Sequence, residues 1–410
     1  MRFGANYTPS QHWWHVWLDF DTPGVRDGIR RDLDAVAGLG LDHVRVFPTW
    51  PVFQPNRGVV RPRAVGQLVE LVRLAAAAGL DVSVDGIQGH LSSFDFYPSW
   101  TLTWHRRNVF TDPEVVDGQA LLLRTLAGAL RGEPNYLGIT LGNEPNNLVA
   151  HNPVTPAQVD AWLDRLLAEC AAADPDHPAT HCAYDAVWYD DGHPFTPAAA
   201  ANKGALTCVH PWVFSGDCAR RYGALSTAAT HLAEYVVELA RAYAADPARV
   251  TWVQELGAPA PHVPVADAPA FASAALSHVL SCVRLWGVTW WCSHDVDRRL
   301  LDYPELEYGL GLLTTDNTVK PVGAALARAV AGTPPAAAPR PTALVLDDAG
   351  GSARSASAPG GAYFEAWMRL AADRAATAVV LASRADDPAR LAARGITTLA
   401  RPSEQGDRPA

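Results

Sequence analysis

The stretch Leu137-Gly-Ile-Thr-Leu-Gly-Asn-Glu-Pro145 has the pattern of a short buried strand that ends in a polar and an acidic residue. A brief apolar run bounded by Gly and Pro is typical of a strand inside a parallel sheet. A second stretch, Val250-Thr-Trp-Val-Gln-Glu-Leu-Gly257, has the same form and also carries a glutamate near its end. Because active-site groups of parallel barrels gather at the carboxyl ends of the strands, Glu144 and Glu255 are predicted to converge.

Strand and helix patterns alternate on both sides of these two stretches. Eight strands are predicted, at 3–7, 43–47, 81–87, 137–142, 180–184, 205–209, 250–254 and 287–291. Helices are predicted at 25–39, 64–78, 113–130, 155–170, 225–244, 268–284 and 320–330, from apolar residues at helical spacing. Eight strands that alternate with helices predict an α/β fold, the (β/α)8 or TIM barrel. A doubly wound sheet is disfavoured, because Asn6-Tyr-Thr-Pro9 stands where its Gly-rich turn would follow the first strand.

The sequence divides into a large and a small unit. The (β/α)8 catalytic barrel is predicted over 1–333, followed by a linker at 334–341 that is rich in Pro and Ala. A small C-terminal α/β appendage is predicted over 342–402, and the polar tail 403–410 is expected to be disordered. The Ala-rich helices of the appendage suit packing between subunits, so we expect a homo-oligomer that forms through this accessory domain.

Composition excludes several classes of function. The chain has 410 residues and a net charge of −10, which argues against a nucleic-acid partner. No stretch approaches the roughly 18 apolar residues of a membrane span, and the opening residues lack the pattern of a signal peptide. We therefore expect a cytoplasmic enzyme. The six cysteines form no C-x-x-C pair and no H-E-x-x-H motif is present, so buried free thiols, no metal and no cofactor are expected.

Polar and aromatic residues gather at the predicted carboxyl ends of strand after strand. They are Arg45, His90, Asn143, Glu144, His210, Trp212, Glu255, Trp290 and Trp291. A packed barrel interior would not need them, because a buried charge costs several kcal/mol unless it is paired. Two carboxylates that flank one bond are the minimum equipment for hydrolysing a glycoside. The pattern therefore predicts an enzyme whose partner is an oligosaccharide substrate.

Asn143-Glu144-Pro145 and Glu255 resemble the retaining glycosidases of the large (β/α)8 clan, glycoside hydrolase family 5 in particular. Asn6-Tyr-Thr-Pro-Ser10, His43-Val-Arg-Val-Phe-Pro48 and Gln88-Gly-His-Leu-Ser-Ser-Phe-Asp-Phe96 resemble the subfamily 18 β-mannosidases. The resemblance covers the predicted barrel. It implies a retaining exo-β-mannosidase acting on Man-β-1,4-GlcNAc of the N-glycan core, or on short β-mannosides. An endo-β-mannanase or other β-glycosidase on the same barrel, a transglycosylase and a non-catalytic sugar-binding protein remain alternatives.

The resemblance also implies roles for the two glutamates and their neighbours. Glu255 is the expected nucleophile that forms a glycosyl-enzyme, and Glu144 is the expected acid and then base. Arg45 is expected to hold Glu255 ionised. The charge of Glu255 and partial burial are expected to raise the pKa of Glu144. Asn143 is expected to hydrogen-bond the sugar 2-hydroxyl.

The other site residues are expected to contact the sugar or position the glutamates. His210 resembles the strand-six histidine of the family, and Trp212 stands where the family often has a Tyr, so that only an indole N–H is offered to Glu255. Side chains alternate along a strand, so only one of Trp290 and Trp291 lies beneath the −1 sugar, and Trp290 is favoured. Two segments, 88–105 and 294–308, are expected to wall the cleft through His90, Asp95, Trp100, Trp104, Asp295 and Glu305.

Overall fold

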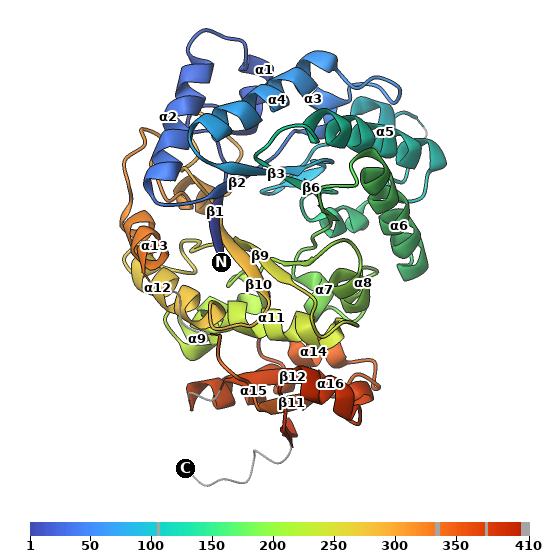
Figure 1. Ribbon diagram of the computed structural model, residues 1–410, viewed down its shortest axis with the longest axis vertical. Coiled ribbons are helices and arrows are strands. Elements are labelled where there is room, and N and C mark those ends of the chain that lie inside the picture. Colours follow the sequence, from blue (N-terminus) through green and yellow to red (C-terminus); the bar gives the residue numbers. More distant parts are fainter. Residues whose placement is uncertain (105–106, 333–336, 374–375, 403–410) are drawn as a thin grey trace.

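The computed structural model describes residues 1–104, 107–332, 337–373 and 376–402. Its large sheet is wholly parallel and runs in the order β7-β6-β3-β2-β1-β10-β9-β8. The strands are β1 (Arg2–Asn6), β2 (His43–Val46), β3 (Asp81–Asp85), β6 (Tyr136–Thr140), β7 (Ala179–Thr180), β8 (Thr207–Val209), β9 (Thr251–Leu256) and β10 (Leu285–Trp290). The sheet curls into a barrel ringed by helices, which confirms the (β/α)8 fold (Figure 1).

Helices cover the outside of the barrel at the predicted places. They are α2 (Val25–Gly38), α4 (Pro62–Ala77), α5 (Pro113–Leu130), α6 (Pro156–Ala173), α11 (Leu232–Tyr243), α12 (Ala268–Val279) and α13 (Pro321–Ala331). The buried side of α2 is formed by its helically spaced residues, such as Ile29 and Leu33. The Asp112 side chain accepts hydrogen bonds from the first backbone N–H groups of α5, which fixes the start of that helix. The predicted helix 225–244 is instead two, because α10 (Thr227–Thr230) precedes α11.

The barrel seam lies between β7 and β8, the two ends of the hydrogen-bonded order. The ladder of β7 stops at Thr180, whereas a strand was predicted over 180–184. The residues after Thr180 contact the candidate site instead of a neighbouring strand. The Cys182 sulfur lies 3.4 Å from the backbone nitrogen of Glu144 and 3.7 Å from the guanidinium of Arg45. The backbone pairing of β7 therefore ends next to Arg45 and Glu144, at the carboxyl end of the barrel.

Two loop elements stand over the carboxyl ends of the strands. A hairpin of β4 (His90–Leu91) and β5 (Phe94–Asp95) follows β3, and a short 3-10 helix, η5 (Glu305–Gly309), lies in the long connection after β10. Aromatic rings join them, because the Phe94 ring lies 5.1 Å from Tyr303, and the Tyr303 ring lies 5.7 Å from Tyr308 of η5. The two elements form a wall on one side of the barrel mouth.

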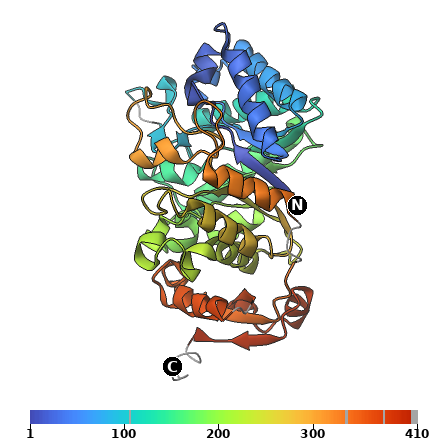
Figure 2. The ribbon, with the colours of Figure 1, turned by 90° about the vertical axis from the view of Figure 1, so that its left-hand side faces the viewer.

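The C-terminal residues form a separate small sheet. It runs β12-β11-β13, all parallel, from β12 (Thr377–Leu381), β11 (Thr342–Leu346) and β13 (Thr398–Ala400). The associated helices are α14 (Ala353–Ser357), α15 (Ala362–Ala372) and α16 (Pro388–Ala393). This layer lies against α11 at one side of the barrel, with α14 beside α7 (Ala186–Tyr189) and α15 beside α10 (Figures 1 and 2). The expected disordered tail 403–410, the last position of the expected barrel (333) and positions 334–336 of the expected linker lie outside the described residues.

The six cysteines are free and buried, as expected. Within the described ranges, no helix has the length and the apolar character that crossing a membrane requires.

Candidate active site

Glu144 is held by an unusual backbone conformation at the end of β6. Its φ of 42° and ψ of 52° are left-handed, a region that costs about 1–2 kcal/mol for a residue with a Cβ. The preceding turn is tight, because a Cβ on Gly142 would lie 2.0 Å from the carbonyl oxygen of Ile87. Strain of this kind persists where surrounding contacts fix it, and it is common at functional sites. Here it turns the Glu144 carboxyl over the barrel mouth, where Oε2 accepts a hydrogen bond from Asn147 at 3.1 Å.

Glu255 lies within β9 and is held by a donor on each carboxyl oxygen. The Arg45 guanidinium donates to Oε1 at 2.8 Å, and the Trp212 indole N–H donates to Oε2 at 3.1 Å. An ionised carboxylate, which only accepts, is the form that two such donors favour. Trp212 therefore supplies the donor that the sequence left open, in place of the Tyr that is frequent in the family.

Arg45 is fully buried beneath both glutamates and links four strands. It makes a bidentate pair with Asp85 at 2.8 and 2.6 Å and donates to Asn143 Oδ1 at 2.7 Å and Asn6 Oδ1 at 3.0 Å. Burial acts to lower the pKa of Arg45, but Asp85 and Glu255 raise it above its ordinary value. The cation is therefore permanent and fixes the orientation of Glu255 and Asn143 together.

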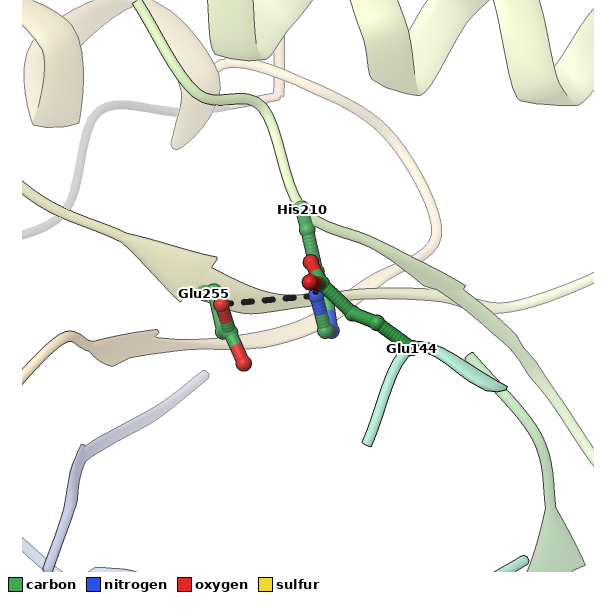
Figure 3. Close-up of side chains that lie close together, drawn as sticks. All are labelled: Glu144, His210 and Glu255. Atoms are coloured by element: carbon green, nitrogen blue, oxygen red, sulfur yellow. Dashed lines mark hydrogen bonds and ion pairs between the residues drawn. The ribbon is translucent and has the colours of Figure 1, made fainter. Parts of the chain in front are cut away.

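His210 stands between the two glutamates (Figure 3). Its Nδ1 lies 2.7 Å from Glu144 Oε1 and 3.4 Å from Glu255 Oε2. Its Nε2 lies 3.1 Å from Gln254 Oε1, while Gln254 donates through its own Nε2 to Thr140 at 3.0 Å. Because the Gln254 oxygen can only accept, His210 must keep a proton on Nε2. The nitrogen that gains or loses a proton is then Nδ1, which faces Glu144.

The three groups share protons at close range. Burial acts to raise the pKa of Glu144, but His210 lowers it below its ordinary value through the hydrogen bond and its charge. The pKa of His210 is raised well above its usual range by Glu255 and Glu144, although burial opposes this. Burial and the charge of Glu144 raise the pKa of Glu255, against the opposing effects of His210 and Arg45. These directions favour an ion pair, with the shared proton on His210 Nδ1 in its hydrogen bond to Glu144.

This arrangement corrects one expectation about charge. We expected burial and the charge of Glu255 to raise the pKa of Glu144. Burial does act in that direction, but the pKa is lowered, because the hydrogen bond and the charge of His210 outweigh burial. The proton is nevertheless available to Glu144. Its transfer along the 2.7 Å hydrogen bond converts the ion pair into a neutral imidazole and a carboxylic acid.

The separation of the carboxyls favours one stereochemical course. An oxygen of Glu144, an oxygen of Glu255 and Nδ1 of His210 all lie within 4.8 Å of one another. Retaining glycosidases hold their two carboxyls about 5–5.5 Å apart, whereas inverting enzymes need about 6.5–9.5 Å to admit a water. Such a triad could also hold a metal ion, but its atoms are hydrogen-bonded to each other and to the Arg45 cation. The donor set favours proton exchange, and the absence of a metal stays a prediction.

A cavity of about 520 Å³ opens over the glutamates, within the range of small-ligand sites. Its walls combine polar groups with aromatic rings. It is lined by His90, Ser92, Ser93, Asn143, Glu144, Asn147, Tyr184, Trp212, Phe214, Glu255, His262, Trp291, Leu306, Glu307 and Leu310. Of the nine residues expected at the site, His90, Asn143, Glu144, Trp212, Glu255 and Trp291 line this cavity.

One expectation needs correction, and two are narrowed. Trp290 was favoured as the sugar platform, but it lies in the main core, and its neighbour Trp291 lines the cavity, as the alternation along the strand allows. Arg45 and His210 were expected to bind the substrate or to position the glutamates. Both are fully buried and outside the cavity lining, which favours the positioning role over direct contact with a sugar.

The two wall segments are partly as expected. Among the side chains named there, only His90 lines the cavity, with its Nδ1 bound to Asp95 across the hairpin at 2.7 Å. Trp104 is exposed, Trp100 is buried in the core, and Glu305 faces solvent in a pair with Arg298. Sequence reasoning missed Glu307, two positions after Glu305. No local pattern distinguishes these two glutamates, because the choice depends on how η5 turns against the hairpin.

Two solved structures of high similarity cover nearly the whole chain. A subfamily 18 member of glycoside hydrolase family 5 from Streptomyces cattleya is 58% identical over 98% of this chain and 99% of that chain, with a TM-score of 0.95. The chain belongs to subfamily 18 of glycoside hydrolase family 5. A subfamily 18 structure from Bifidobacterium longum subsp. longum is 40% identical over 100% of this chain and 97% of that chain, with a TM-score of 0.93.

Both of those relatives are glutamate-to-alanine variants in complex with Manβ1-4GlcNAc. An exo-β-1,4-mannosidase from Opitutaceae bacterium strain TAV5 is 23% identical over 93% of this chain and 69% of that chain, with a TM-score of 0.77, and it shows the fold alone. Neither the family models nor the curated proteins gave a match. As a member of subfamily 18, the protein is a glycoside hydrolase, and its close carboxyl pair fits the retaining mechanism.

Proposed function

We propose that this subfamily 18 protein is a retaining exo-β-mannosidase that hydrolyses Man-β-1,4-GlcNAc, the disaccharide of the N-glycan core, or short β-mannosides. The observation that carries the proposal is the approach of Glu144 and Glu255 to within 4.8 Å at the floor of a walled cavity. The complexes of two relatives with Manβ1-4GlcNAc support this choice of sugar.

The first step would form a covalent glycosyl-enzyme. Glu255 attacks the anomeric carbon of the mannose, and Glu144 gives a proton to the departing glycosidic oxygen. The proton comes from the His210–Glu144 pair, by transfer from Nδ1 along their hydrogen bond. As Glu255 loses its negative charge to the new bond, Arg45 keeps its pair with Asp85, so the buried guanidinium is not left without an anion.

The second step would return the enzyme to its starting state. Glu144, now a carboxylate, accepts a proton from water as the water oxygen attacks the anomeric carbon. The bond to Glu255 breaks, and the released carboxylate is stabilised by Arg45 and Trp212, which already point at its two oxygens. Donors placed where charge develops need no rearrangement, which is the main source of stabilisation in such sites.

The cavity lining suggests how the mannose would be held. Asn143 Oδ1 accepts a hydrogen bond from Arg45, so the amide N–H groups of Asn143 are the ones that can donate to the sugar 2-hydroxyl. The Trp291 ring offers an apolar face for the C–H side of the pyranose. His90, oriented by Asp95, offers a ring nitrogen to a hydroxyl.

The test is hydrolysis of p-nitrophenyl β-mannoside, β-glucoside and β-galactoside beside Man-β-1,4-GlcNAc. We expect mannose to be released preferentially from the disaccharide, with β-mannose as the first anomer seen by NMR. Glu144→Gln and Glu255→Gln should each lose this activity. Turnover of β-mannan instead would indicate an endo-mannanase, and sugar binding without turnover of any substrate would indicate a binding protein.

We also propose that copies of the protein associate through the C-terminal appendage. β13 is an edge strand with Thr398 and Leu399 exposed, and exposed edges offer unpaired backbone groups to a second strand. Leu399→Lys should reduce the mass seen by light scattering if β13 pairs between copies. An unchanged mass in this variant, or a monomeric wild type, would contradict the proposal.

A cytoplasmic location is proposed on separate grounds. All six cysteines are free thiols, which suits a reducing compartment. Fractionation of the producing cells should find the protein with cytoplasmic markers, and recovery from the medium would contradict this.

A further inference from the structure

Glu307 is a third carboxyl on the cavity wall that the two-step mechanism does not use. It lies in η5, is only 7% exposed, and shares the cavity lining with Glu144 and Glu255. Its Oε2 accepts a hydrogen bond from the hydroxyl of Ser92 at 3.1 Å. Ser92 belongs to the hairpin after β3, so this contact joins the two loop elements that wall the cavity.

Burying an ionised carboxyl at this place costs free energy unless a cation pairs with it. In the part of the chain that the structure describes, no Lys, Arg or His forms an ion pair with Glu307. Burial and the nearby charge of Glu255 raise the pKa of this carboxyl to about 7, while donation from Ser92 and Trp291 acts to lower it. A group with neutral donors only, facing a cavity, is suited to accept further hydrogen bonds from a neutral polar ligand.

The Ser92 contact depends on a strained turn. Leu91 pairs with Phe94, so Ser92 and Ser93 form a two-residue hairpin loop, with φ of 52° and 75°. Such loops strongly prefer Asn and Gly, because both central residues need positive φ. Serine at both positions costs about 1–2 kcal/mol per residue relative to a relaxed conformation. Strain of this kind occurs where side chains serve a site, and here it puts the Ser92 hydroxyl on Glu307.

We propose that Glu307, held in place by Ser92, accepts hydrogen bonds from hydroxyl groups of the terminal sugar and so determines which glycone the enzyme accepts. This inference rests on the proposed glycosidase function and specifies its glycone site. A carboxylate has no donor, so each hydrogen bond that it makes to the sugar requires a sugar hydroxyl in the right orientation. Sugars that differ in one hydroxyl would leave an acceptor site of this buried carboxyl unfilled beside its Ser92 hydrogen bond, which is a basis for rejection.

The chain offers a matched control for this proposal. Glu305 belongs to the same short helix, but it faces solvent in a pair with Arg298 and does not line the cavity. Glu305→Gln removes the same charge from the same element without touching the proposed contact. Ser92→Ala removes only the hydrogen bond that orients Glu307.

The experiment compares wild type, Glu307→Gln, Ser92→Ala and Glu305→Gln on whichever p-nitrophenyl β-glycoside the wild type hydrolyses best. Each enzyme is also tested on the analogues that lack one glycone hydroxyl at a time. Glu307→Gln should lower kcat/KM about 10- to 100-fold on the parent glycoside. The penalty for removing one particular hydroxyl should be large for wild type and clearly smaller for Glu307→Gln, because the amide keeps one acceptor oxygen but loses the charge and the second acceptor oxygen. Ser92→Ala should show a smaller loss at the same hydroxyl, and Glu305→Gln no change.

Two failures can be told apart. If the wild type hydrolyses no β-mannoside but does hydrolyse another glycoside, the proposed substrate is wrong, and the deoxy series on that glycoside still tests Glu307. If Glu307→Gln and Ser92→Ala lose activity equally on the parent and on every analogue, the carboxyl does not contact the sugar and the proposal is overturned. If Glu307→Gln does not fold, as judged by circular dichroism, Ser92→Ala alone decides the outcome.

Discussion

The two glutamates of the site are held in different ways, and the difference suits their proposed roles. Glu144 lies just past its strand, in a left-handed conformation, with its Oε1 on a titratable histidine. Glu255 lies inside β9, with its oxygens on two fixed donors, Arg45 and Trp212. A group that must gain and lose a proton needs a partner that can do the same. A nucleophile needs a carboxylate that stays ionised and does not rotate.

His210 is predicted to set the alkaline limit of activity. In the wild type the proton that Glu144 needs is held by the pair, and it leaves only as pH rises through the raised pKa of His210. Without the imidazole, Glu144 has no partner to hold the proton and loses it as pH rises through the pKa of Glu144 itself. His210→Asn should therefore move the alkaline limb of the kcat/KM profile to lower pH and reduce kcat about 10- to 100-fold. Trp212→Phe should reduce kcat but leave that limb in place, and an unmoved limb in His210→Asn would refute the assignment.

Asp185 predicts a pH dependence of stability. It is buried, its Oδ2 accepts from Ser215 and from the backbone N–H of Trp212, and burial raises its pKa from 3.8 to about 7. The folded state binds this proton more tightly than the unfolded state, so stability falls as pH rises from about 4 to about 7, by at most about 4 kcal/mol. Asp185→Asn should flatten the fall in Tm between pH 5 and pH 8. An equal slope in both proteins would show that this carboxyl does not titrate there.

At the scale of elements, the end of β9 is shaped around the Trp212 ring. A Cβ on Gly257 would lie 2.8 Å from the indole of Trp212 and 2.8 Å from the carbonyl oxygen of Trp291. Gly257→Ala should displace the indole from Glu255, lower kcat about 10- to 100-fold and cost about 1–3 kcal/mol of stability. Gly132→Ala is the control, because a Cβ there meets nothing within 4 Å. Full activity in Gly257→Ala would mean that the ring position is not critical.

The elements themselves follow from the sequence because their signals are local. Apolar spacing and strand-end residues predicted all eight barrel strands. The prediction that Glu144 and Glu255 meet at the carboxyl ends of β6 and β9 is also confirmed. The contact of Glu307 with Ser92 joins residues 215 apart and depends on the angle of η5, which no periodicity records. The choice between Trp290 and Trp291 failed for a similar reason, since alternation shows that they differ but not which one faces the cavity.

At the scale of the whole molecule, the appendage completes the outer surface of the barrel. Every residue of α11 except Tyr243 is buried, including the charged Glu234 and Glu238. A helix on the outside of a barrel would normally expose such groups to water. Here Arg340 pairs with Glu234 at 2.5 Å and Arg394 with Glu238 at 3.0 Å, and both arginines come from the C-terminal residues. These ion pairs therefore depend on the barrel and the appendage being folded together.

Breaking this interface is predicted to destabilise the molecule without changing its chemistry. Arg394→Met leaves Glu238 with fewer partners in a buried place, which should cost about 3–5 kcal/mol in urea unfolding. The double variant Arg394→Met/Glu238→Gln should recover part of that loss, because the stranded charge is removed. Arg298→Met, at an exposed pair, should leave unfolding almost unchanged. At a temperature where Arg394→Met is folded, its kcat should equal that of the wild type, because the appendage lies against α11 and contributes no residue to the cavity lining described above. A loss of kcat with unchanged stability would instead mean that the appendage acts on the active site.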